Sequence, residues 1–211
     1  MQERILVTKD KIYLGLIEEL KLKPLTSLTD RDVIKTAHVS SGTFYKYFRN
    51  LTDALRCLEN NFLESYTSCL KADLSLWHVE ELFNSDKVKC MVESDLNQTF
   101  EFWNHHSEDL LILVSQNGEK YFYDKLISQT KSEIKQLLGR YSKIDQNINI
   151  TSNKLKMDQF SEQVAVSEVT TLIWSYKHLE YLSRNDIRKS VAEILINSPC
   201  NLILNNEKVA N

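Results

Sequence analysis

The sequence predicts an all-α protein made of a small N-terminal helical domain and a larger helical domain after it. The 211 residues include only 4 Gly and 2 Pro, which argues against a turn-rich β architecture and against a glycine loop that cradles phosphates. Leu, Lys, Glu and Ile are abundant and favour helices. A hydrophobic content of 42% is sufficient for a buried core.

The first helix is predicted over residues 9–22. Ile12, Leu16 and Leu20 recur at intervals of four and therefore lie on one face, while charged side chains occupy most of the other positions. Pro24 ends this helix, because the residue before a proline is displaced from the α region.

Residues 29–48 read as two short capped helices joined by a tight turn. Thr29 is positioned to cap the first of them, and Asp32, three residues later, places a carboxylate over the free N–H groups of the first turn. Val33 and Ala37, four residues apart, share the inward face. The pattern predicts a helix-turn-helix.

The second short helix begins after Ser40, which supplies another cap, with Thr43 at its third position. Phe44 and Phe48 form its buried stripe. The polar side chains therefore project away from the core, and hydroxyls with a lysine and tyrosines suit a surface that meets phosphates and base edges. This outward set consists of Ser41, Thr43, Lys46 and Tyr47.

The run Val39-Ser-Ser-Gly-Thr-Phe-Tyr-Lys-Tyr-Phe48, preceded by Leu28-Thr-Asp-Arg-Asp-Val33, resembles the DNA-binding domain of the tetracycline-repressor-like (TetR) regulators. The similarity covers roughly residues 9 to 60. It implies an all-helical homodimer whose N-terminal domains bind a roughly palindromic operator in double-stranded DNA. It also implies a C-terminal domain that holds the dimer interface and a pocket for a small-molecule effector, still unknown.

The resemblance assigns roles to individual residues of the motif. Thr29, Tyr45 and Tyr47 are expected to bind phosphates, and Ser41, Thr43 and Lys46 to reach base edges, because a reading helix enters the major groove by its N-terminal half. The predicted DNA-binding set is Thr29, Ser40, Ser41, Thr43, Tyr45, Lys46 and Tyr47.

Two positions depart from the family pattern. His38 stands where the family usually has Gly in a left-handed turn, which costs about 1 kcal/mol there. Leu51 stands where a lysine often contacts phosphate, so one phosphate contact is missing, and Arg49 is a candidate substitute.

The net charge of −3 is unevenly distributed. Residues 1–60 contain ten Lys or Arg and eight carboxylates, a net of +2, and the remainder carries −5. A mildly basic head on an acidic body favours head-first approach to a polyanion, although the asymmetry is small.

Further helices are predicted after the motif. Asn50 caps one that runs to about Leu70, and the domain assignment is 1–50 for DNA binding, 51–70 for a connecting helix, and 71–211 for effector binding and dimerisation. The predicted helices of the body are Lys87–His106, Glu108–Val114, Tyr121–Leu138, Asp158–Ser183 and Asp186–Asn197, with a break near Asn117-Gly118 and a loop at 142–153.

Two further sets of residues in the body are candidates for binding. Aromatic side chains between helices line either an apolar ligand pocket or an ordinary core; the pocket candidates are Phe100, Trp103, Phe122 and Trp174. The resemblance makes the last two helices a dimerising pair, although an intramolecular core would show the same stripe; the interface candidates are Val169, Leu172, Ile173, Tyr176, Ile187, Val191 and Ile194.

No catalytic or metal-binding pattern stands out. His105 and His106 with Glu108 and Asp109 resemble a metal cluster, but adjacent helical residues point about 100° apart, which favours surface residues at a helix end. The four cysteines show no C-x-x-C spacing and are read as free, mostly buried thiols. We expect no metal, no cofactor and no enzymatic activity.

Three functional hypotheses follow, in decreasing order of support. The first is a dimeric transcriptional regulator, in this family most often a repressor, that a small molecule releases from its operator. The second is an adaptor of the same fold that acts through protein partners, and the third is a small enzyme on a helical scaffold. Without an apolar run long enough to cross a bilayer or an apolar N-terminal signal segment, the expected location is the cytoplasm, with no membrane association.

Overall fold

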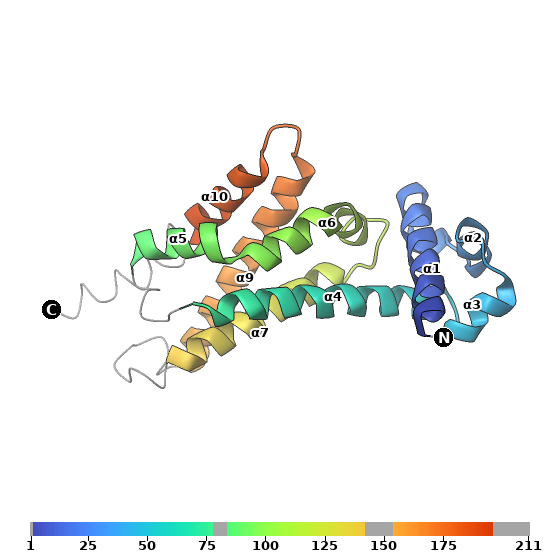
Figure 1. The fold of residues 1–211 in the computed structure, drawn as a ribbon, viewed down its shortest axis with the longest axis horizontal. Helices are drawn as coiled ribbons and strands as arrows, with labels where there is room; N and C mark the ends of the chain where they lie inside the picture. Colours follow the sequence, from blue (N-terminus) through green and yellow to red (C-terminus); the bar gives the residue numbers. More distant parts are fainter. Residues whose placement is uncertain (1, 78–83, 142–153, 196–211) are drawn as a thin grey trace. The chain divides into compact units, whose positions relative to one another are not determined.

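In this computed structural model, which describes residues 2–77, 84–141 and 154–195, every regular element is a helix. The all-α prediction is therefore confirmed for the part of the chain that is described. In chain order, as traced in Figure 1, the elements are α1 (Gln2–Leu22), the short 3₁₀ helix η1 (Leu25–Ser27), α2 (Asp30–Thr36), α3 (Ser41–Tyr47), α4 (Leu51–Ser75), α5 (Ser85–Asp95), α6 (Asn97–Leu113), α7 (Phe122–Tyr141), α9 (Lys154–Lys177) and α10 (Arg184–Leu195).

The chain divides into two packing units, which are described separately. The first comprises residues 1–64 and 108–123, and the second comprises 65–107 and 124–211. Three helices, α4, α6 and α7, carry the chain from one unit into the other. The functional division at residues 50 and 70 stays a prediction, because packing units do not report on function.

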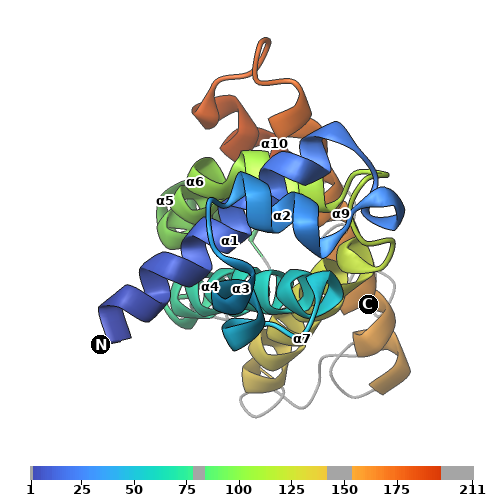
Figure 2. The ribbon, with the colours of Figure 1, turned by 90° about the vertical axis from the view of Figure 1, so that its right-hand side faces the viewer.

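The core of the first unit is formed where α1 packs against α2, with α3 beside them (Figure 2). Ile12, Leu16 and Leu20 are completely buried, as their spacing predicts. Gly15 permits the close approach, because a Cβ at this position would lie 2.8 Å from the backbone nitrogen of Ala37 and 2.9 Å from its Cβ. Sequence periodicity did not indicate this requirement.

The helix α1 begins seven residues before the predicted start at residue 9. The added residues, about two turns, include Leu6 and Val7, which are exposed, so they contribute no apolar stripe from which this part of the helix could have been predicted.

The break at Asn117-Gly118 is confirmed, and its polar groups join the end of α1 to the segment 108–123. The side-chain amide of Asn117 donates to the carbonyl oxygen of Leu20 at 3.0 Å. The backbone carbonyl of Asn117 accepts a hydrogen bond from the backbone N–H of Leu25 at 2.9 Å. A Cβ at Gly118 would lie 2.1 Å from the carbonyl oxygen of Leu113, so the turn requires glycine.

In the second unit, the predicted single helix 87–106 is wrong: α5 ends at Asp95, and α6 begins at Asn97 and continues to Leu113 without the predicted stop before Glu108. The break has a long-range cause. The buried carboxylate of Asp73 on α4 accepts hydrogen bonds from the backbone N–H groups of Gln98 at 3.2 Å and Thr99 at 2.7 Å. A carboxylate at that position caps a new helix N-terminus, so the chain starts α6 there.

Helix α10 packs against α5 and α9 in the second unit. Both last helices differ from prediction at their ends: α9 spans Lys154–Lys177 rather than 158–183, and α10 begins at Arg184, after a Ser183–Asp186 pair that caps it. The predicted loop 142–153 lies outside the described residues.

Among the described helices, none combines the length and apolar character needed to cross a bilayer.

Candidate nucleic-acid interface

The first turn of α2 is fixed by a reciprocal cap, as predicted. The backbone N–H of Asp32 donates to the Thr29 hydroxyl, while the Thr29 backbone N–H and hydroxyl donate to Asp32 Oδ2 at 2.9 and 2.7 Å. Lys23 Nζ lies 2.9 Å from the same oxygen. The hydrogen bond from Lys23 is the main cause that lowers the pKa of Asp32 to about 2, and the hydrogen bonds from Thr29 are the next.

The turn between α2 and α3 has the left-handed residue that the sequence predicts. His38 adopts a φ of 51°, and within the described residues no other non-glycine residue has a positive φ. Its N–H donates to the carbonyl of Lys35, and the N–H of Val39 donates to the carbonyl of Ile34, both at 3.2 Å. This is a Schellman ending, a geometry that glycine adopts without strain.

Helix α3 is capped by Ser40, whose Oγ accepts from the Thr43 backbone N–H at 3.0 Å. Phe44 and Phe48 are buried, and Ser41 and Lys46 are exposed. The ammonium of Lys46 lies 5.6 Å from the ring centroid of half-buried Tyr47. The structure thus places Ser41, Lys46 and Tyr47 on the outer part of one short helix, above an apolar base.

Asp30, which the sequence reading did not single out, ties this helix to its neighbours. Its Oδ2 accepts from the Tyr45 hydroxyl at 3.0 Å, and its Oδ1 accepts from the backbone N–H of Leu51 at 2.7 Å. The hydrogen bond with Asp30 raises the pKa of Tyr45. The partners are 15 and 21 residues away, so no local pattern signals them.

The start of α4 confirms the predicted Asn50 cap, and the Leu51 side chain is buried there. The Asn50 side chain accepts from the Asp53 backbone N–H at 2.9 Å, and Asp53 accepts from the Arg49 backbone N–H at 3.0 Å. The Leu51 side chain is 7% exposed. The guanidinium of Arg49 is exposed and makes no hydrogen bond or ion pair with the described residues.

Charges around the motif are partitioned by sign. The carboxylates of Asp30, Asp32 and Asp53 all accept hydrogen bonds from the chain itself. The cations, in contrast, are exposed and form no ion pair within the described part of the chain; they are Arg31, Lys35, Lys46 and Arg49. Asp32 and Asp53 stay ionised but are paired with Lys23 at 2.9 Å and with Arg56 at 2.8 Å, so the unpaired charges of this surface are mostly positive.

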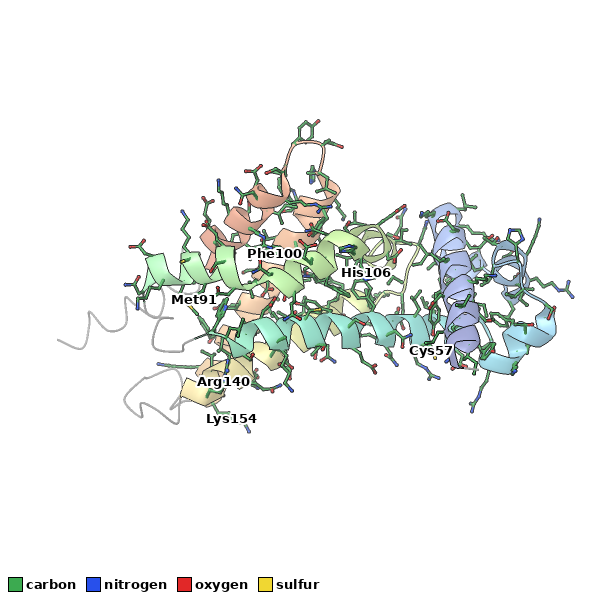
Figure 3. The ribbon with its side chains drawn as sticks, viewed as in Figure 1. Cys57, Met91, Phe100, His106, Arg140 and Lys154 are labelled. Carbon is green, nitrogen blue, oxygen red and sulfur yellow. The ribbon has the colours of Figure 1, made fainter. Side chains whose placement is uncertain are left out.

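The predicted ligand-pocket aromatics are not gathered into one site. Trp103 is buried beside Tyr66, with ring centroids 4.7 Å apart, whereas Trp174 is 55% exposed and stacks on His178. Phe100, labelled on α6 in Figure 3, lies under the Arg188 guanidinium at 4.5 Å. Phe122 belongs to the first unit, where it meets Phe62.

Most of the predicted dimer-interface residues are buried within the single chain. Their side chains are at most 8% exposed, except that of Ile194, which is half-buried; the buried ones are Val169, Leu172, Ile173, Tyr176, Ile187 and Val191. They belong to the core of the second unit, where they pack within the single chain.

Within the described residues, no three His, Cys, Asp or Glu side chains are arranged to hold a metal ion. His105 is an exposed surface residue whose Nδ1 lies 2.7 Å from the carbonyl oxygen of Glu101. The expectation of mostly buried thiols is wrong for the described cysteines: Cys57 and Cys69 are half-buried and Cys90 is exposed. Cys200 lies outside the described residues.

Comparison with models of known protein families gives no match, and none of the curated proteins searched is significantly similar to this chain. The TetR resemblance therefore rests on the motif residues quoted above.

Proposed function

We propose that this protein is a dimeric, sequence-specific DNA-binding transcriptional regulator, most simply a repressor, whose hold on its operator is tuned by a small molecule bound in the second unit. The proposal joins the TetR resemblance of residues 28–48 to the charges around α2 and α3.

The observation that carries it is the sign partition of the motif. Asp32 and Asp53 are each paired with a cation of the chain, Lys23 and Arg56 respectively. Four further cations, Arg31, Lys35, Lys46 and Arg49, are exposed without ion pairs to the described residues. Such a surface attracts a polyanion even though the whole chain carries −3.

Recognition would divide between two kinds of contact. Ser41 and Thr43, in the N-terminal half of α3, would meet base edges, and Lys46 extends from the same helix. Tyr45 would exchange its hydrogen bond with Asp30 for one with a phosphate oxygen. The Thr29 hydroxyl, which donates a hydrogen bond to Asp32, would similarly have to donate to a phosphate oxygen as well.

The segment 108–123 offers a route by which a ligand could act on the motif. Lys21 Nζ near the end of α1 lies 2.6 Å from Glu108, and Asn117 bonds to Leu20 and Leu25. Because α6 and α7 lead from this segment into the second unit, a shift of either helix would be transmitted to the C-terminal end of α1.

For the dimer, the outward stripe of α9 is a better candidate than its buried one. Leu155, Val166 and Trp174 are 77%, 37% and 55% exposed, and their spacings of eleven and eight residues keep them on one side of the helix. We expect a Val166→Ala, Trp174→Ala double variant to be monomeric in sedimentation equilibrium at concentrations where the wild type is a dimer. Leu76→Ala, which removes an equally exposed side chain elsewhere, should leave the mass unchanged.

The adaptor alternative is favoured by one observation. The Tyr45 and Thr29 hydroxyls, which the resemblance assigns to phosphate, already donate to Asp30 and Asp32. The Leu51 backbone N–H likewise donates to Asp30. A protein that does not bind DNA could retain these intrachain hydrogen bonds permanently.

Selection of fragments from random DNA at moderate salt tests the proposal. We expect the wild type to enrich a roughly palindromic site, and Lys46→Ala to lose affinity with a salt dependence about 0.9 units shallower. Lys89→Ala removes an exposed lysine of the second unit and should bind as the wild type does. Failure of the wild type to enrich any sequence would overturn the regulator and leave the adaptor.

A further inference from the structure

A buried carboxylate in the second unit lacks a partner. Glu168 on α9 is 6% exposed, and among the described residues it makes no hydrogen bond and no ion pair. Burying an ionised carboxylate in this way is unfavourable, so buried acids in folded proteins are nearly always hydrogen-bonded or paired with a cation. This one calls for an explanation.

The surroundings of Glu168 are aromatic and weakly polar. Its negative charge acts on the completely buried Tyr66 of α4, whose pKa is raised first by burial and then by Glu168. The Tyr66 hydroxyl is 2.7 Å from Thr130 Oγ1 on α7, and its ring lies against that of Trp103 on α6. Four helices thus contribute to one interior region.

Other polar groups in this interior are also without partners. Ser175 lies two turns after Glu168 on the same face of α9, and its Oγ is buried without a hydrogen bond. On α6 the buried Thr99 Oγ1, one turn before Trp103, is in the same condition. The hydrogen bond from the Tyr176 hydroxyl to Asn104 at 3.0 Å shows that these stretches of α9 and α6 face each other.

The cations that the chain carries nearby are engaged elsewhere. Lys131 and Lys135 on α7 bind Asp158 at 3.0 and 2.7 Å, and Lys131 also binds Glu162 at 2.8 Å. Arg188 on α10 donates to the Glu93 carbonyl and lies over Phe100. When Glu168 is ionised, a counter-charge for it would therefore have to come from outside the described chain.

We propose that Glu168 anchors a binding site in the second unit for a small organic cation, a substituted ammonium compound, beside Tyr66 and the unpartnered hydroxyl of Ser175. Aromatic neighbours and scarce hydrogen-bond donors favour a weakly hydrated organic cation over a strongly hydrated metal ion. This inference rests on the proposed function in one respect, that the second unit receives the effector, and it names the chemical class of that effector.

Calorimetric titration of the whole protein, without DNA, tests the inference. The probes are tetramethylammonium, choline and benzyltrimethylammonium, with 3,3-dimethylbutan-1-ol as the neutral carbon isostere of choline. We expect at least one cation to bind, and choline to bind at least tenfold more tightly than its isostere if choline is the one. Glu168→Gln, which keeps the shape and removes the charge, should weaken the cation at least tenfold.

Glu193→Gln is the control, because it removes one negative charge from an exposed position of α10 in the second unit. It should change cation affinity by less than threefold. Binding by none of the cations, equal binding of the isostere, or unchanged binding by a folded Glu168→Gln protein would each overturn the inference.

The outcome is separable from that of DNA selection. Cation binding by a protein that enriches no DNA would leave this site standing while the regulator fails. An enriched operator with no cation binding would support the regulator and overturn the cation site.

Discussion

The surface of α2 and α3 and the interior of the second unit treat their polar groups in opposite ways. At the surface, the carboxylates of Asp30 and Asp32 have partners in the chain although water is close by. In the interior, Glu168 makes no hydrogen bond with the described residues although it is only 6% exposed, and the Oγ of Ser175 is buried without a partner. Proteins usually satisfy buried groups first, so the reversal marks the interior as a place where stability has been given up.

The largest expected effect tests that reading at Glu168. Burial raises the pKa of Glu168 from 4.5 to about 7, so the folded state holds a proton that the unfolded chain releases. The free energy of unfolding is therefore highest below pH 4.5, where Glu168 is protonated in both states. It falls as the pH rises from 4.5 through 7, because the unfolded chain ionises before the folded one. At pH 8.5 we therefore expect Glu168→Gln to be more stable than the wild type by about 3 kcal/mol.

At pH 5 the same difference should fall to about 1 kcal/mol or less, because the wild-type carboxyl is then protonated in the folded state. Urea unfolding of both proteins at the two pH values measures it. A stability difference that does not change with pH would mean that Glu168 finds a counter-charge in solution.

The second expectation concerns the packing under the motif. Gly15→Ala places a Cβ within 3.0 Å of Ala37, which forces α1 away from α2 and should destabilise the protein by about 2 kcal/mol. Gly139→Ala on α7 is the control, because a Cβ there meets nothing within 4 Å. The control should gain up to about 0.5 kcal/mol from helix propensity. Equal effects of the two variants in thermal unfolding would contradict the packing argument.

Local features of the first unit could be predicted from sequence because their partners are close along the chain. Thr29 meets Asp32, Ser40 meets Thr43, and His38 occupies the left-handed turn. Features set by distant partners could not. The Asp73 cap that splits α5 from α6 joins residues more than twenty positions apart, and the continuous amphipathic pattern through that region predicts a single helix instead.

The body shows the same limit for candidate sites. A stripe of apolar residues on α9 does not reveal whether its partner is another helix of the same chain or a second copy. Val169 and Leu172 lie in the chain's own core, while Trp174 on the same helix is exposed. Glu168 was missed because one charged residue inside an apolar stretch is ordinary in sequence and unusual only once its burial is known.

The third expectation tests how much the hydrogen bonds accepted by Asp30 at the surface contribute to the free energy of unfolding. Asp30→Ala removes the acceptor for the Tyr45 hydroxyl and for the partly buried Leu51 N–H, so we expect a loss of about 1.5 kcal/mol. Tyr45→Phe removes only the more exposed hydrogen bond and should lose less than about 1 kcal/mol. Urea unfolding followed by circular dichroism measures both, and a larger loss for Tyr45→Phe would show that Leu51 is not held by Asp30.

The smallest expected effect concerns the one place where the surface motif is itself strained. His38 holds a φ of 51° in a turn whose hydrogen bonds from His38 and Val39 do not involve its side chain. His38→Gly should therefore keep the Schellman ending, relieve the left-handed cost and stabilise the protein by about 0.5 to 1 kcal/mol. His38→Ala retains a Cβ and should be no more stable than the wild type. If Ala stabilises as much as Gly, the histidine side chain rather than the backbone is the source of the strain. If neither does, the strain is absorbed by the caps at Thr29 and Ser40, and the motif is stiffer than its short helices suggest.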